Sequence, residues 1–158
     1  MILYAAIGAL FVFLGGMVYY STLDFPELEK SELELLSVDV VEIDSIDNRI
    51  TLKIVFGITN FGERTVTVPE IGFDLSANGI SLGSSSYSVS DIPMTGRALM
   101  ISGMQVPLAT EMTVSLTEHT KDVYEAIANG ESVVYRANGQ YTIETAWQVI
   151  DIQFDSSI

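Results

Sequence analysis

The chain contains no cysteine, and this absence excludes disulfide bonds, thiolate metal sites and cysteine nucleophiles. Positive charge is scarce as well, because 7 Lys and Arg stand against 21 Asp and Glu, for a formal net charge of -14 and a pI of about 4.1. A surface this acidic repels phosphate backbones and anionic lipid headgroups. We therefore expect no nucleic-acid partner, and a domain that is held together by its apolar core alone.

Recognisable catalytic patterns are absent too. Glycine-rich phosphate loops, Walker patterns and zinc-protease patterns do not occur, and no asparagine begins a glycosylation sequon. His119 is the single histidine, and no recognisable motif places a nucleophile beside it, so we interpret it as an exposed residue at the start of a helix. The sequence predicts a protein that is not an enzyme and that has no cofactor.

The first twenty residues have no charged side chain, since the first acid is Asp24 and the first base is Lys30. About twenty helical residues at roughly 1.5 Å each cover the hydrocarbon core of a bilayer, about 30 Å. Tyr4 and the pair Tyr19 and Tyr20 stand near the two ends of this run, where aromatic rings prefer the lipid boundary. The sequence predicts a transmembrane anchor over residues 1–22 that contacts membrane lipid through residues 2–20.

Three features of this anchor have alternatives. A cleaved secretory signal and a buried helix of a soluble protein are the other interpretations of the segment itself; against the signal, no base precedes the apolar run and the exit at Ser21 lacks a small-residue cleavage pattern. The positive-inside rule gives little information, because few Lys or Arg residues flank the span. We expect a single-pass protein of the cell membrane with its C-terminal domain outside the cytoplasm. Gly15 and Gly16 lie about two turns after Gly8, and the three would suit close packing against another helix, although glycine is common in membrane helices.

After a short acidic stalk over residues 23–32, residues 33–158 read as one β-rich domain. The clearest strand is 49–60, where apolar residues occupy one parity and polar residues the other. Before it, the apolar parity changes near Val40 and Val41, which predicts a bulge. Later, the spacing of Val123, Ala126 and Ile127 predicts one short helix, with Thr117 or Thr120 as its cap and Asn129-Gly130 as its end.

Turn signals divide the rest of the domain into short strands. We expect a turn at Asp47-Asn48, tight hairpins at Asn78-Gly79 and Asn138-Gly139, a serine-rich connection over Ser84 to Ser90, a turn over Pro93 to Gly96, a break near Val106 and Pro107, and an edge or bent strand at Pro69. Seven or so strands at this spacing, with one helix, predict an all-β antiparallel sandwich.

The order of these features resembles the late-embryogenesis-abundant type 2 family, also called the water-stress and hypersensitive-response (WHy) domain, including its archaeal members. The matching segments are ITLKIVFGITNFGERTVTVPEIGFDLSANGISLGSS, then MQVPLATEMTVSL, the short helix and GQYTIETAWQVIDIQF. The resemblance covers nearly all of Leu33 to Phe154, but the family usually has Asn-Pro where this chain has Asn60-Phe61. It implies an immunoglobulin- or fibronectin-III-like sandwich without catalytic residues, linked to desiccation stress, membrane association or partner binding.

Two groups of residues are candidates for binding. Asp39, Glu42, Asp44 and Asp47 could offer oxygen ligands to calcium or magnesium, but the EF-hand order is absent, and acids along a strand also make a solvated face that discourages aggregation. Trp147 and Tyr141 could anchor a partner, although a sandwich also needs large residues in its core.

Two classes of function agree with these features. In the first, the domain is a non-catalytic interaction or structural module, an accessory subunit that contacts other subunits of a membrane complex. In the second, which the family resemblance implies, it is a stress-protective module that binds membranes or unfolded proteins.

Overall fold

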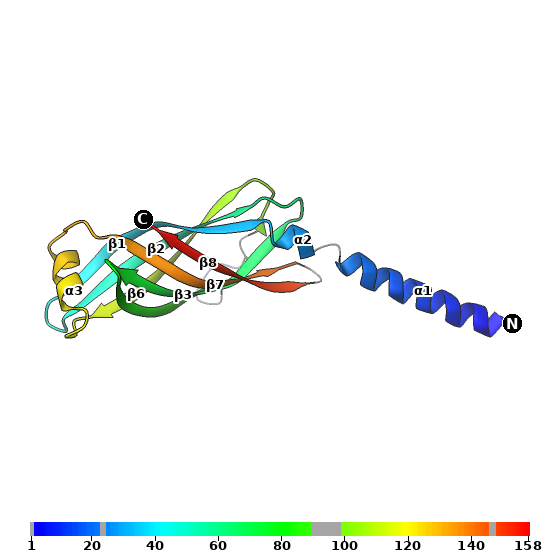
Figure 1. Cartoon of the computed structure of the whole chain (residues 1–158), viewed down its shortest axis with the longest axis horizontal. Helices are drawn as coiled ribbons and strands as arrows, with labels where there is room; N and C mark the ends of the chain where they lie inside the picture. The colour runs from blue at the N-terminus through cyan, green and yellow to red at the C-terminus, as the bar shows by residue number, and fades with distance from the viewer. Residues whose placement is uncertain (1, 23–24, 90–98, 146–147) are drawn as a thin grey trace.

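The computed structural model describes residues 2–22, 25–89, 99–145 and 148–158, in which eight strands and three helices are assigned (Figure 1). In chain order, the elements are α1 (Ile2–Thr22), α2 (Phe25–Leu28), β1 (Ser31–Asp44), β2 (Arg49–Asn60), β3 (Val66–Ala77), β4 (Ile80–Ser88), β5 (Leu99–Met100), β6 (Gln105–Ser115), α3 (Lys121–Ala128), β7 (Tyr135–Glu144) and β8 (Val149–Ser157).

The strands form two antiparallel sheets. One has the order β1-β2-β6, and the other has the order β4-β3-β7-β8, with the short β5 paired to the start of β3. This confirms the predicted class, an all-β sandwich with one short helix in the domain and an apolar helix before it. Figure 1 shows α1 standing apart from the sheets, with α3 at the end of the sandwich remote from it.

The strand with the strict period of two supplies the centre of the core. In β2 the residues Ile50, Leu52, Ile54, Phe56 and Ile58 are all buried, as their alternation predicts. The ring of Phe56 meets the rings of Phe73 and Phe154 edge to face, with centroids 4.9 and 5.7 Å apart. Since Phe73 and Phe154 belong to the other sheet, these aromatic contacts join the two layers of a domain that has no cross-links.

Side chains close the gap between the two sheets at both edges. On one edge the Leu35 amide donates to the Ser156 hydroxyl (2.9 Å), joining β1 to β8. On the other edge the Thr110 hydroxyl donates to the Ser86 carbonyl (3.2 Å), joining β6 to β4. At the far end α3 contributes Val123, Tyr124 and Ile127 to the same core, which confirms the predicted helix.

Several local predictions are confirmed. The register of β1 against β2 shifts between Val40 and Glu42, so Val41 is the extra residue of the expected bulge. Asn78 and Gly79 both have positive φ, 50° and 81°, as a tight hairpin requires. Helix α3 ends at Asn129 and Gly130, and Thr120 occupies its N-cap position, but the Thr120 hydroxyl donates to the Ser115 carbonyl instead of capping the helix.

Other local predictions are right only in part or are wrong. The strand of Pro69, expected to be an edge or bent, is the central strand β3, and its register against β7 shifts between Thr67 and Glu70, which agrees with the bent alternative. The serines from Ser84 to Ser88 belong to edge strand β4, where an exposed face tolerates them. The break expected near Val106 and Pro107 falls at 101–104 instead, and the turn expected at Pro93 to Gly96 lies outside the described residues.

The hairpin predicted at the second Asn-Gly pair is also wrong, and the reason is informative. Asn138 and Gly139 lie in the middle of β7, which is paired on both sides, and they form no hairpin. A Cβ on Gly139 would lie 2.1 Å from the Gly72 carbonyl oxygen and 2.8 Å from the Phe73 Cα. This glycine therefore permits a close approach of two backbones, which is the other reason for a glycine inside a strand.

We expect Gly139→Ala to destabilise the domain by at least about 2 kcal/mol, because its methyl group meets backbone that cannot move without disturbing β3. Gly72→Ala is the matched control on the neighbouring strand, since its Cβ would meet no atom closer than 4.0 Å; it should change stability by less than about 1 kcal/mol. Unfolding of the detergent-solubilised chain, followed by circular dichroism, measures both. Equal midpoints for the two variants would contradict the close approach.

Candidate functional site

Helix α1 is the first part of the candidate site. Its segment Leu3–Tyr20 has a mean hydropathy of 1.8, and none of that segment is buried against the rest of the protein. By length and composition it can cross a membrane, although a signal sequence near the N-terminus would pass the same test. A Cβ on Gly8, Gly15 or Gly16 would meet no atom within 4 Å, so this face of α1 is open in the single chain.

The short helix α2 follows almost at once. Thr22 and Phe25 are three residues apart, so their Cα atoms can be separated by at most about 11 Å. Leu28 of α2 is buried in the core, and its carbonyl accepts a hydrogen bond from the Ser31 hydroxyl (3.2 Å) at the start of β1. Only a short piece of chain therefore separates the end of α1 from the first buried residue of the sandwich.

Asn60, at the end of β2, organises the loops around α2. The residue is only 1% exposed, and its side-chain amide donates to the carbonyls of Arg64 (2.7 Å) and Met100 (3.0 Å). Its side-chain oxygen accepts from the Gly62 amide (2.9 Å), and its backbone carbonyl accepts from the Gly103 amide (2.7 Å). The buried side chain of Asn60 thus joins β2, the β2–β3 loop and β5, and its backbone carbonyl adds the segment after β5.

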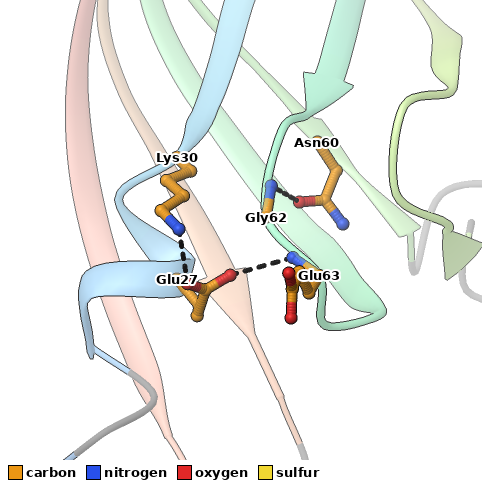
Figure 2. A network of polar contacts seen from close by, with 5 residues as sticks. All are labelled: Glu27, Lys30, Asn60, Gly62 and Glu63. Atoms are coloured by element: carbon orange, nitrogen blue, oxygen red, sulfur yellow. Dashed lines mark hydrogen bonds and ion pairs between the residues drawn. The ribbon is translucent and has the colours of Figure 1, made fainter.

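Glu27 connects α2 to this assembly (Figure 2). One carboxylate oxygen accepts from the Glu63 amide (2.9 Å), and the other pairs with the Lys30 ammonium group. A Cβ on Gly62 would lie 2.6 Å from the Glu27 carbonyl oxygen, so only glycine lets the loop approach α2 this closely. We call residues 25–30, 60–65 and 100–104 together the collar.

The hydrogen bonds lower the pKa of the Glu27 carboxyl below its ordinary value of 4.5, chiefly through Lys30 and then through the Glu63 amide. A carboxyl whose pKa is lower in the folded state stabilises that state above its unfolded pKa, and this contribution is lost as the pH falls through the folded value. The Glu27 carboxylate therefore stabilises the collar in its ionised form, and this contribution is lost in acid.

The acidic candidates do not gather into one site. The Asp44 carboxylate accepts from the amides of Ile46 (2.9 Å) and Asp47 (3.1 Å), and these bonds lower its pKa and shape the β1–β2 turn. Asp39 accepts from the Ser37 hydroxyl (2.9 Å), and Glu42 pairs with Thr51 across the strands. In the described part of the chain, no three His, Asp or Glu side chains are placed to hold a metal ion.

The remaining candidate residues lie elsewhere. His119 is exposed in the turn before α3. Tyr141 is 1% exposed, and its hydroxyl donates to the Ser31 carbonyl (3.0 Å), so it packs in the core and offers no surface to a partner. Trp147 lies outside the described residues.

The collar itself was not predicted from the sequence, but a signal for it exists. Asn60 continues the parity of Ile54, Phe56 and Ile58, so the alternation of β2 directs a polar side chain into the core. A buried amide needs partners, and this predicts a hydrogen-bonded loop at the strand end. Its partners on 100–104 are forty residues away and could not be named.

Fold and site together define a class: a two-sheet, all-β domain joined by a rigid collar to an exposed apolar helix. No protein-family model and no curated protein matches the sequence. The fold is similar to a solution structure of a protein from Arabidopsis thaliana, at 14% identity and TM-score 0.55, covering 80% of each chain. It is also similar to a protein from Bordetella pertussis provisionally named ApaA, at 8% identity and TM-score 0.50, covering 81% of this chain and 91% of that one.

A solution structure of a protein provisionally assigned to the late embryogenesis abundant class matches at 9% identity and TM-score 0.49, covering 96% of this chain and 84% of that one. At these identities the likenesses to the Arabidopsis thaliana and Bordetella pertussis proteins establish the fold alone.

We expect Glu27→Gln to lower the unfolding midpoint at neutral pH, because the neutral amide loses its ion pair with Lys30. The gap from the unmodified chain should shrink as the pH falls through the lowered pKa of Glu27, since the unmodified carboxyl then becomes neutral too. Glu29→Gln, a change at an exposed neighbour, is the control and should leave the midpoints nearly unchanged. A gap for Glu27→Gln that does not vary with pH would contradict this role of the carboxylate.

Proposed function

We propose that the chain is a non-catalytic, membrane-anchored module whose sandwich projects from the extracytoplasmic face of the cell membrane, where it serves as an accessory subunit of a membrane protein complex. The observation that carries this proposal is an exposed, uncharged helix of 21 residues joined without a long linker to a rigid collar. An apolar surface of that size needs a lipid or protein environment.

The sequence at Ser21 favours an anchor over a cleaved signal, and the short connection to the collar agrees with it. A removed signal normally ends in a small-residue cleavage pattern, and the exit at Ser21 lacks one. Here α2 begins three residues after α1 ends, and Leu28 already packs in the core. The short connection and the buried Leu28 leave little extended chain between the helix and the folded domain.

The anchor and its orientation can be tested in a chain that has no cysteine of its own. Ile46→Cys, in the exposed β1–β2 turn, should react with a membrane-impermeant maleimide in intact cells, and Val12→Cys in α1 should not react. The protein should stay in the membrane pellet after an alkaline wash. Reaction of Ile46→Cys only after permeabilisation would reverse the orientation, and a mature chain that begins beyond Ser21 would exclude the anchor.

The open glycine face of α1 supports association with other helices. Glycine removes the side chain that separates two helix backbones, and Gly8 and Gly15 are seven residues apart, so they share a face. Packing by such faces is a common way for subunits to associate inside a bilayer, where the hydrophobic effect does not drive them together.

We expect Gly15→Leu to release the chain from its complex in mild detergent, because a leucine holds the partner helix away. Ala6→Leu is the matched control; it adds a similar side chain on the opposite face of α1 and should leave the complex intact. Blue-native electrophoresis of both variants from membranes measures the association. Release by both substitutions, or by neither, would contradict a subunit interface on the glycine face.

The stress-protective function is the second candidate, and it rests on the sequence resemblance to the late-embryogenesis-abundant type 2 family over Leu33 to Phe154. The same electrophoresis separates the two. A chain that migrates alone, and whose Gly15→Leu variant behaves like the unmodified protein, favours a module that acts on membranes or unfolded proteins by itself.

A further inference from the structure

Five large apolar side chains are exposed on or beside the collar. They are Phe61, Leu99, Ile101, Met104 and Val149, each between 51% and 65% exposed, and we call them the apolar rim. Single exposed apolar residues are ordinary on a protein surface, but several gathered on the loops and strand ends at one end of a domain mark an interaction surface.

The collar holds the rim in place. The Phe61 amide donates to the Lys30 carbonyl (2.9 Å), and the turn that carries Ile101 is closed by the Met104 amide (3.1 Å) and fixed to Asn60 through Gly103. Leu99 and Val149 lie in one row across the sheet that contains β3, β5, β7 and β8. In this row Leu99 is paired with Thr67, Thr67 is paired with Glu144, and Glu144 is paired with Val149. Because backbone bonds fix the loops and the row, little ordering is needed when the rim is covered.

The rim also lies beside the end of α1. The Arg64 guanidinium group, in the collar, lies over the ring of Tyr20 at 6.0 Å from its centroid. Tyrosines at the end of a membrane span sit at the level of the lipid headgroups. The β2–β3 loop is therefore held at the depth of the lipid boundary when α1 spans the bilayer.

The charges near the rim indicate which lipid surface fits. Among the described residues near the rim, the acids are Glu27, Glu29, Glu63 and Glu144 and the bases are Lys30 and Arg64, so this part of the surface is net acidic. Anionic headgroups would be repelled, and only apolar burial can draw the rim to lipid.

We propose that the apolar rim lies in the boundary between headgroups and acyl chains of the bilayer that α1 spans. The collar then contacts the membrane surface, and the sandwich projects from it. This inference rests on the proposed anchor. The occupant is the bilayer because the rim is continuous with the helix that enters it. Apolar side chains at the other end, such as Ile46, lie beyond the 14 residues of β1, roughly 40 Å away, and serve as controls.

The test uses the full chain in phosphatidylcholine vesicles, with single cysteines labelled by an environment-sensitive fluorophore and with nitroxide lipids as quenchers. Labels at Phe61→Cys, Ile101→Cys and Val149→Cys should be quenched several-fold more than a label at Ile46→Cys. Phe61→Asp should reduce the quenching at Ile101→Cys, and Ile46→Asp, the matched charge at the far end, should not.

A label at Val12→Cys keeps the two proposals distinguishable. Quenching at Val12→Cys without quenching at the rim overturns the rim and leaves the anchor standing, whereas no quenching at Val12→Cys overturns the anchor itself. Rim quenching that requires added phosphatidylserine would overturn apolar burial as its cause. Rim labels that are shielded from aqueous iodide in native membranes, but not quenched by nitroxide lipids, would show that a protein covers the rim and would also overturn the proposal.

Discussion

The anchor-side end of this molecule depends on one buried side-chain amide. A carboxamide carries two donors and an acceptor on one plane, so Asn60 can satisfy the carbonyls of Arg64 and Met100 and the Gly62 amide together. An aspartate would offer acceptors only, and a leucine nothing, so either would leave buried backbone groups without partners at a cost of about 1–3 kcal/mol each. The loops that surround α2 owe their shape to this residue, which makes the collar a rigid base and not a flexible tether.

The sequence predicted those parts of the fold that a strand periodicity or a turn decides locally. The alternation in β2 identified five core residues, the change of parity near Val40 located a bulge, and Asn78-Gly79 located a hairpin. Asn138-Gly139 has the same two residue types as Asn78-Gly79 but lies in a strand, where its glycine leaves room for the Gly72 carbonyl of the neighbouring strand. Local sequence cannot distinguish these two uses of glycine, since the deciding atom is 67 positions away in the chain.

The candidate site was harder to predict for the same reason. Its bonds connect α2 with the β2–β3 loop and the end of β2 with β5, and the acids that looked most like a site, such as Asp44, serve a turn instead. Acidic side chains are numerous here, so their density carries little information about position. A polar residue at a core parity position is rare by comparison, and Asn60 shows that such an exception deserves more weight than a cluster of exposed charges.

Charge and apolar surface are segregated along this chain, and the segregation itself favours one orientation. All formal side-chain charges follow Tyr20, so the sandwich is strongly acidic while α1 is uncharged. An acidic domain held close to a membrane by a short connection is repelled wherever its charged faces approach anionic headgroups, and it gains only where apolar side chains meet lipid. On the proposed arrangement, the rim, which includes the starts of β5 and β8, is such a region, and the rest of both sheets lies away from the membrane. The outer faces of the two sheets then remain in water, free to meet the soluble parts of a partner, while the glycine face of α1 meets its helices.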